Sequence, residues 1–223
     1  VSPKDTNLHV SSKVMQKAYD HAKNSLYDCS IIALGVDLIE SESKPIVLKA
    51  CVRIIETAGT DLLGQLENVD LTNLICGLVK MSSSTPLSSR SASIFMILFR
   101  VVLARNFETF ELYELSRILE AIANVISTQR APLIAKTLMN DHSVIKFIAH
   151  SMERMKCSDL VTIDMLANLA WAYAECNKLR SRSCWEHFEI LGRCFAAVSS
   201  GLSRGIQSEQ MNLSTMYKTA FAV

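Results

Sequence analysis

The chain has 223 residues, of which 49% are apolar, and this composition excludes a generally disordered protein. Its 23 lysines and arginines are balanced by 22 aspartates and glutamates, so the net charge of +1 confines any basic surface to a local patch. Only seven glycines and four prolines are present, which disfavours a sheet protein because tight turns between strands need those residues. The composition therefore predicts long helices joined by polar loops.

In chain order, the first helical patterns lie at Leu26, at Pro45–Thr57 and at Leu71. Leu26 begins the apolar segment LYDCSIIALGV, and Leu71 begins LTNLICGLVKM. In PIVLKACVRIIET, between them, Pro45 suits the first helical turn and Gly59 suits a C-terminal stop. The apolar face predicted for this helix consists of Val47, Ala50, Cys51 and Ile54.

Further helices are predicted at 88–105, at Leu115 (LSRILEAIANV) and at 132–139. The apolar stretch ASIFMILFRVVLA in the first of these is interrupted by Arg100 and is too short to span a bilayer, which predicts a buried core helix. A helix over His142–Met155 follows the N-cap signal Asn140-Asp141. Its predicted apolar face consists of Val144, Ile145, Ile148 and Met152.

The last predicted helices cover 162–177, 184–198 and 208–222. The first, TIDMLANLAWAYAECN, is apolar on almost every side, which is typical of a helix packed between neighbours. We expect Trp171 and Tyr173 to make large contributions to that packing. The helix at 184–198 has apolar residues at spacings of three and four, namely Phe188, Leu191, Phe195 and Val198.

A leucine with an apolar residue three positions on recurs through these helices. Leu71, Leu115, Leu166 and Leu213 are 44, 51 and 47 residues apart, and Leu26 lies 45 residues before Leu71. A recurrence near 45 is typical of helical repeats with two or three helices per unit. We therefore predict an all-α fold, an α-solenoid of antiparallel helix pairs with about four to five repeats of roughly 45 residues, in which each pair covers its neighbour's apolar face. It forms a single domain over 1–223, and the missing initiator Met predicts a fragment of a longer chain.

Candidate catalytic residues are few. Cys184 and His187 are three apart on one helix, but no second ligand pair follows at metal spacing, so a buried thiol and a surface imidazole are favoured. His142 and His150 fit solvated or capping positions, and the acids Glu108, Glu111 and Glu114 fit a helix start. No phosphate-binding, dinucleotide-binding or hydrolase motif is present. These observations predict a protein that is not an enzyme and has no cofactor, metal or small-molecule substrate.

The seven cysteines are odd in number, scattered and without a CxxC pair, which predicts reduced thiols and no disulfide framework. They are Cys29, Cys51, Cys76, Cys157, Cys176, Cys184 and Cys194.

Basic residues gather after the helix at 162–177. If the loops of successive repeats align, such charges form a stripe that follows a phosphate backbone; the alternative, which charge alone favours, is ordinary solvated loop charge. The predicted nucleic-acid-binding residues are Lys178, Arg180, Arg182, Arg193 and Arg204. Upstream, the same stripe would include Arg90, Arg100, Arg105 and Arg130.

The segment TIDMLANLAWAYAECN resembles the signature helix of octotricopeptide-type repeats, related to those of FAST-kinase-like and RAP-domain organellar proteins, which reads S-x-x-x-L-x-N-L-x-W-A-x-A. The matching residues are Leu166, Asn168, Leu169, Trp171, Ala172 and Ala174. The clearest repeat covers 142–177. In the copy at Leu71, Asn73 is retained and Cys76 stands where the tryptophan would be.

This resemblance implies an RNA-associated protein of an organelle, chiefly the mitochondrion or plastid. The expected role is that of a subunit of a ribonucleoprotein such as the mitochondrial ribosome, located in the mitochondrial matrix without membrane insertion. RNA and neighbouring protein subunits are the implied partners, and a RAP domain would lie outside these residues. The alternative is a protein-interaction scaffold of armadillo or HEAT type without RNA contact.

Overall fold

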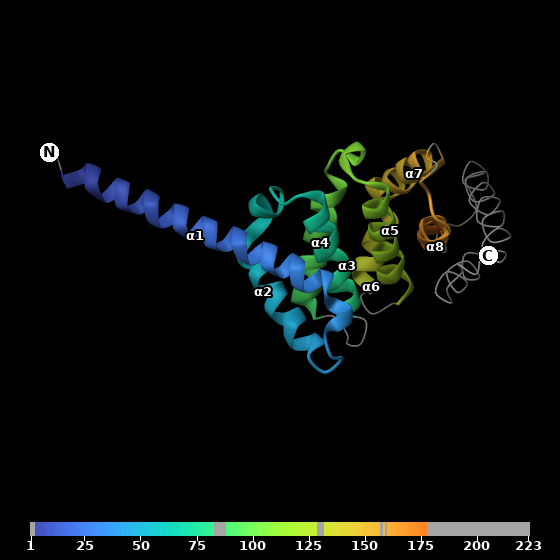
Figure 1. Cartoon of the computed structure of the whole chain (residues 1–223), viewed down its shortest axis with the longest axis horizontal. Coiled ribbons are helices and arrows are strands. Elements are labelled where there is room, and N and C mark those ends of the chain that lie inside the picture. The colour runs from blue at the N-terminus through green and yellow to red at the C-terminus, as the bar shows by residue number, and fades with distance from the viewer. Residues whose placement is uncertain (1–2, 83–87, 129–131, 157, 159, 178–223) are drawn as a thin grey trace. The chain divides into compact units, whose positions relative to one another are not determined.

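The computed structural model describes residues 3–82, 88–128, 132–156, 158 and 160–177. These residues form eight α-helices and two short 3-10 helices, with no strand in the described ranges (Figure 1). The predicted all-α class is therefore confirmed. The chain divides into two compact units, one of Val1–Thr85 with Ser89–Val101 and the other of Pro86–Ser88 with Val102–Val223. Each unit is described by itself, and a single domain over 1–223 stays a prediction.

The first unit is built on the long helix α1 (Pro3–Leu34), which packs against α2 (Lys44–Leu63) and α3 (Asn68–Met81). Only its C-terminal part contacts them, and its N-terminal part runs on beyond them (Figure 1). Leu26, Cys29 and Ala33, three and four residues apart, are buried on the packed face. The short helix η1 (Val36–Leu38) follows α1, and α4 (Ser89–Leu103) contributes the buried Phe95 and Phe99.

Helix α3 is buried on nearly every side, and α1 crosses it closely at Gly77. A Cβ atom added to Gly77 would lie 2.6 Å from the Cα atom of Ala33, and closer still to that residue's Cβ and carbonyl oxygen. The same pair of helices is joined by a hydrogen bond of 2.6 Å that the Ser30 hydroxyl donates to Asp70. Glycine is therefore required at this crossing because any side chain would displace the backbone of α1.

Helix α2 differs from its prediction in two ways. Pro45 does lie in the first turn, but the chain bends at Gly59, with φ 73° and ψ 177°, and the helix resumes as far as Leu63. Glycine adopts this positive φ without strain, and burial of Leu62 and Leu63 holds the extra turn in place. The predicted apolar face was wrong by about one residue, since of its four members only Cys51 is buried. The face that α1 and α3 cover consists of Leu48, Cys51, Val52 and Ile55.

The second unit is centred on α5 (Leu112–Ser127), which packs along α8 (Ile163–Asn177) and also contacts α6 (Pro132–Asn140) and α7 (His142–Lys156). The predicted helices at 132–139 and 142–155 are confirmed to within one residue. Asp141 caps α7 as expected, because its Oδ1 accepts a hydrogen bond of 2.8 Å from the Ser143 amide. Three of the four residues predicted for the apolar face of α7 are buried, and Ile145 is half-buried.

The start of α5 explains the predicted acidic cluster. Glu111 is the N-cap residue, and Glu114 accepts a hydrogen bond of 2.8 Å from the Glu111 amide, which completes a capping box. Glu108 lies earlier, in the short helix η3 (Phe107–Thr109), where it faces α7. Two of the three acids thus serve the helix start, and the third belongs to a contact between η3 and α7.

Candidate functional site

The predicted phosphate-binding residues lie outside the described part of the chain. The same holds for the helices predicted at 184–198 and 208–222, the pair Cys184 and His187, and the anchor Leu213. The five binding residues in question are Lys178, Arg180, Arg182, Arg193 and Arg204. Their role stays a prediction.

Of the upstream arginines of the predicted stripe, Arg90 is paired with a carboxylate and Arg105 has one nearby. The Nε atom of Arg90 donates a hydrogen bond of 2.7 Å to Glu56 of α2. Arg105 lies near Glu114, whose charge raises the pKa of the guanidinium, although burial is the larger effect and lowers it. Arg100 is exposed, and Arg130 lies outside the described residues. The local carboxylates disfavour Arg90 and Arg105 as phosphate ligands, because a phosphate would have to compete with them.

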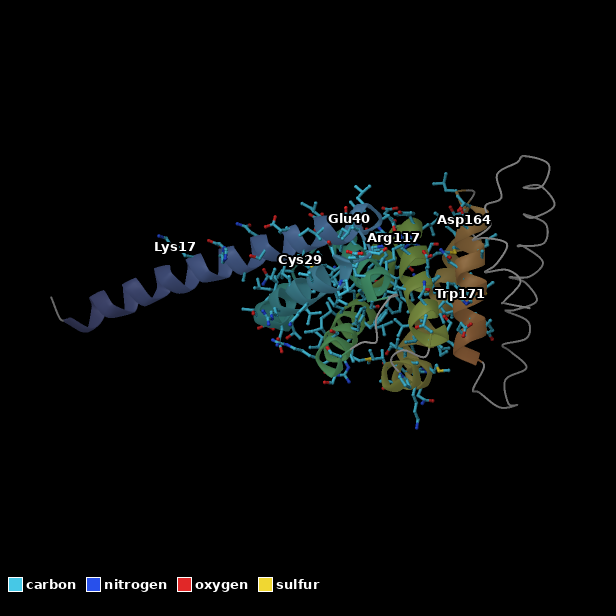
Figure 2. All side chains as sticks on the ribbon, turned by 90° about the horizontal axis from the view of Figure 1, so that it is seen from below. Lys17, Cys29, Glu40, Arg117, Asp164 and Trp171 are labelled. Carbon is cyan, nitrogen blue, oxygen red and sulfur yellow. The ribbon has the colours of Figure 1, made fainter. Side chains whose placement is uncertain are left out.

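Four of the six signature residues of α8 are buried, namely Asn168, Leu169, Trp171 and Ala172. Asn168 donates a buried hydrogen bond of 3.0 Å from its Nδ2 atom to the hydroxyl of Ser116 on α5. Trp171, labelled on α8 in Figure 2, is 6% exposed and donates a hydrogen bond of 3.2 Å from Nε1 to Glu175 one turn later. Asn168 therefore joins α8 to α5, Trp171 is buried and bonded within α8, and neither side chain offers a face on which a base could stack.

The repeat positions are buried to different degrees. Leu26, Leu71 and Leu115 are fully buried, whereas Leu166 is half-buried. Asn73 of α3, which corresponds to Asn168 in the repeat alignment, is buried like its counterpart. A buried amide at the same position of two anchor helices fits a shared packing role, because buried amides need hydrogen-bond partners.

Residues of η3 and α7 form a cluster that the sequence prediction missed. Arg154 donates hydrogen bonds from Nη1 to the carbonyl oxygens of Phe107, Glu108 and Phe110. His150, one turn earlier, places its Nε2 atom 3.6 Å from Oε1 of Glu108 and its ring 5.7 Å from that of Phe107. In the sequence, the signal for this cluster was the spacing of four residues between His150 and Arg154. The cluster ties the turn before α5 to α7, since a guanidinium can satisfy several carbonyl oxygens at once.

The four cysteines of the described ranges are buried and form no disulfide: Cys29, Cys51, Cys76 and Cys176. The thiols of Cys29 on α1 and Cys51 on α2 interact, and this interaction, together with burial, raises the pKa of Cys29. Buried thiols of this kind pack as small apolar groups. In the described residues, no group of three or more histidine, cysteine or acidic side chains could hold a metal ion.

Comparison with known proteins adds no relative, because no family model, curated protein or solved structure matches the chain. None of the helices within the described ranges combines the length and apolar character needed to cross a membrane.

Proposed function

We propose that this chain is an RNA-associated helical-repeat protein of an organellar ribonucleoprotein, with a structural subunit of the mitochondrial ribosome as the specific role. The observation that carries the proposal is the packing of the signature helix. In α8, the residues that match the octotricopeptide-type pattern, Asn168 and Trp171, are buried, and Asn168 is hydrogen-bonded to the preceding anchor helix α5. A signature of this kind is expected to specify repeat stacking.

Contacts within each unit support the solenoid part of the proposal. In the first unit, α1 packs on α3 more extensively than on any other described helix, and these helices carry the anchors Leu26 and Leu71. In the second unit, the most extensive packing joins α5 and α8, which carry Leu115 and Leu166. The two anchor helices of each unit are therefore neighbours, and the second of each has a partner helix before it: α2 contacts α3, and α7 contacts α8. This is the arrangement that stacked helix pairs require.

We assign RNA contact to the basic segment 178–182, which follows α8 in the sequence. We expect Arg180→Glu together with Arg182→Glu to weaken RNA retention several-fold, because each reversal removes a phosphate contact and adds a repelling charge. A matched control is Lys136→Glu with Lys146→Glu, which makes the same change of net charge at exposed positions of α6 and α7. Filter binding over a range of salt concentrations measures both variants. Equal weakening by the two pairs would contradict a specific role for the loop.

The alternative is an armadillo-like or HEAT-like scaffold that binds protein alone. It is favoured by the balanced charge of the chain and by the upstream arginines that have carboxylates nearby. Native purification separates the two functions if bound RNA is sequenced and bound protein is identified with and without nuclease. Protein partners that survive nuclease, in the absence of any bound RNA, would replace the RNA proposal with the scaffold.

A further inference from the structure

A buried polar contact joins the two helices at the centre of the second unit. Helix α5 packs along α8 more extensively than any other described pair of helices in that unit. Within this packing, the Nδ2 atom of Asn168 donates a hydrogen bond of 3.0 Å to the hydroxyl of Ser116. Ser116 is 3% exposed and Asn168 is 5% exposed, so water does not compete for the bond. The net contribution of such a pair to stability is small, because both groups give up hydrogen bonds to water when they are buried.

The apolar side chains of the two helices discriminate weakly between registers. Three of the buried residues of α8 are alanines, namely Ala167, Ala170 and Ala172. The buried residues of α5 are aliphatic apart from Glu114 and Ser116. Because a methyl group forms only a low ridge, a displacement of α8 by one helical turn, about 5.4 Å, would still set apolar side chains against apolar ones. Apolar burial alone therefore permits more than one register of α8 on α5.

The hydrogen bond between Ser116 and Asn168 distinguishes these registers. One turn further along α5, the buried residue is Leu119, whose side chain cannot accept a hydrogen bond from Asn168. One turn further along α8, the buried residue is Ala172, whose side chain cannot donate one to Ser116. A displacement of one turn would therefore break the bond and leave the Asn168 amide buried against apolar side chains, which is costly.

We propose that the pair Ser116 and Asn168 fixes the register of α8 on α5, so that one packing is selected from several with similar apolar burial. A single buried asparagine can set the register of paired helices in this way, at some cost in stability. The pair is thus a conformational device of the fold, and its role goes beyond the proposed function. It concerns packing within the second unit and holds whether or not the chain binds RNA.

The test uses the full chain with Trp185→Phe, which leaves Trp171 as the only tryptophan. Trp171 lies on α8, three residues after Asn168 (Figure 2). In a chain labelled with fluorotryptophan, fluorine NMR reports the surroundings of Trp171, and a single packing gives a single resonance. Ser116→Ala with Asn168→Leu removes both polar groups and keeps a branched side chain at residue 168. We expect helix content in circular dichroism to persist, whereas the resonance should split or broaden several-fold as the helices exchange between registers.

Two further variants separate register from stability, and both should retain one sharp resonance. Ser151→Ala is the matched control, because it removes a buried hydroxyl whose hydrogen bond of 2.8 Å, to the carbonyl oxygen of Phe147, lies within α7. The exchanged pair, Ser116→Asn with Asn168→Ser, keeps both polar groups and their summed volume.

Three outcomes would overturn the proposal. A single sharp resonance in the apolar variant would show that Trp171 and the other apolar side chains fix the register. Loss of helix content in that variant would show that the pair is needed for stability rather than for register. Several resonances in the exchanged pair would show that a polar pair at these positions does not select one packing.

Discussion

The close crossing of α1 and α3 makes the change Gly77→Ala a sharp test of the first unit. In the interior of an exposed helix, replacing glycine with alanine stabilises the helix by about 1 kcal/mol. At Gly77 the new methyl group would lie 2.6 Å from the Cα atom of Ala33, whereas carbon atoms in contact are ordinarily about 3.5–4.0 Å apart. The obstacle is backbone rather than a flexible side chain, so the helices must separate by about 1 Å.

Overpacking of this kind costs about 1–3 kcal/mol, and the upper part of that range applies because no rotamer change relieves the clash. After the gain in helix propensity is subtracted, we expect a net loss of about 1–2 kcal/mol in the free energy of unfolding. Denaturant titration followed by circular dichroism measures the loss. Hydrogen exchange of the α1 and α3 amides locates it, because opening should become easier there first.

Two further variants test whether the close approach of Gly77 to Ala33 causes the loss of stability. Gly35→Ala is the control, because a Cβ atom at Gly35 meets its nearest neighbour, the carbonyl oxygen of Ile31, at an ordinary 3.7 Å. Its stability should be unchanged or slightly higher. Ala33→Gly combined with Gly77→Ala should recover part of the loss, since one of the clashing atoms is removed. A gain of about 1 kcal/mol for Gly77→Ala alone would refute the close crossing.

Three more variants test the second unit. Trp171→Ala should cost about 3–5 kcal/mol of stability because the indole is buried; a thermal melt that shows less than about 1 kcal/mol would place Trp171 at the surface. Arg154→Lys should destabilise the turn before α5, since the lysine side chain is one bond shorter and its ammonium group would not reach the carbonyl oxygens that surround Nη1 of Arg154; faster proteolysis within 105–111 measures this, and unchanged cleavage would contradict the role of Arg154. Burial raises the pKa of Glu114, so its ionised form lowers stability at neutral pH and this cost disappears as the pH falls through the raised pKa towards about 4. The free energy of unfolding of the Glu114→Gln variant should therefore lack the gain that the unchanged protein shows as the pH falls from about 7 to about 4. Denaturant titrations at several pH values measure this, and parallel pH profiles for the two proteins would contradict the role of Glu114.

Local patterns in the sequence were sufficient to predict where several helices begin and end. The helix at 142–155 was predicted from the cap at Asp141 and from apolar spacing, and α7 begins at His142 and ends at Lys156. The short helix at 132–139 was predicted to account for the longer interval between Leu115 and Leu166, and α6 covers Pro132–Asn140. Capping and spacing signals act within one or two helical turns, so they are readable without knowing what packs on the helix.

The predicted face of α2 failed because two stripes of its sequence, one residue apart, have similar apolar content. Only the positions of α1 and α3 select the stripe that contains Leu48 and Val52. Gly59 was predicted to end the helix. It does interrupt the helix, but the helix resumes after it because Leu63 is buried. The candidate phosphate-binding loop lies outside the described residues, so the sequence remains its only support.

By itself the sequence determined the helical class, the order of the helices within the described ranges and the position of the signature segment, because these follow from composition, capping residues and apolar spacing along one chain. Tertiary structure alone decided which atoms meet. Asn168 is recognisable as a signature residue from the sequence, yet its bond to Ser116 exists only because α8 packs along α5. Gly77 reads as an unfavourable residue for a helix until Ala33 is found against it. Contacts between distant segments depend on how helices pack, and no local pattern encodes that.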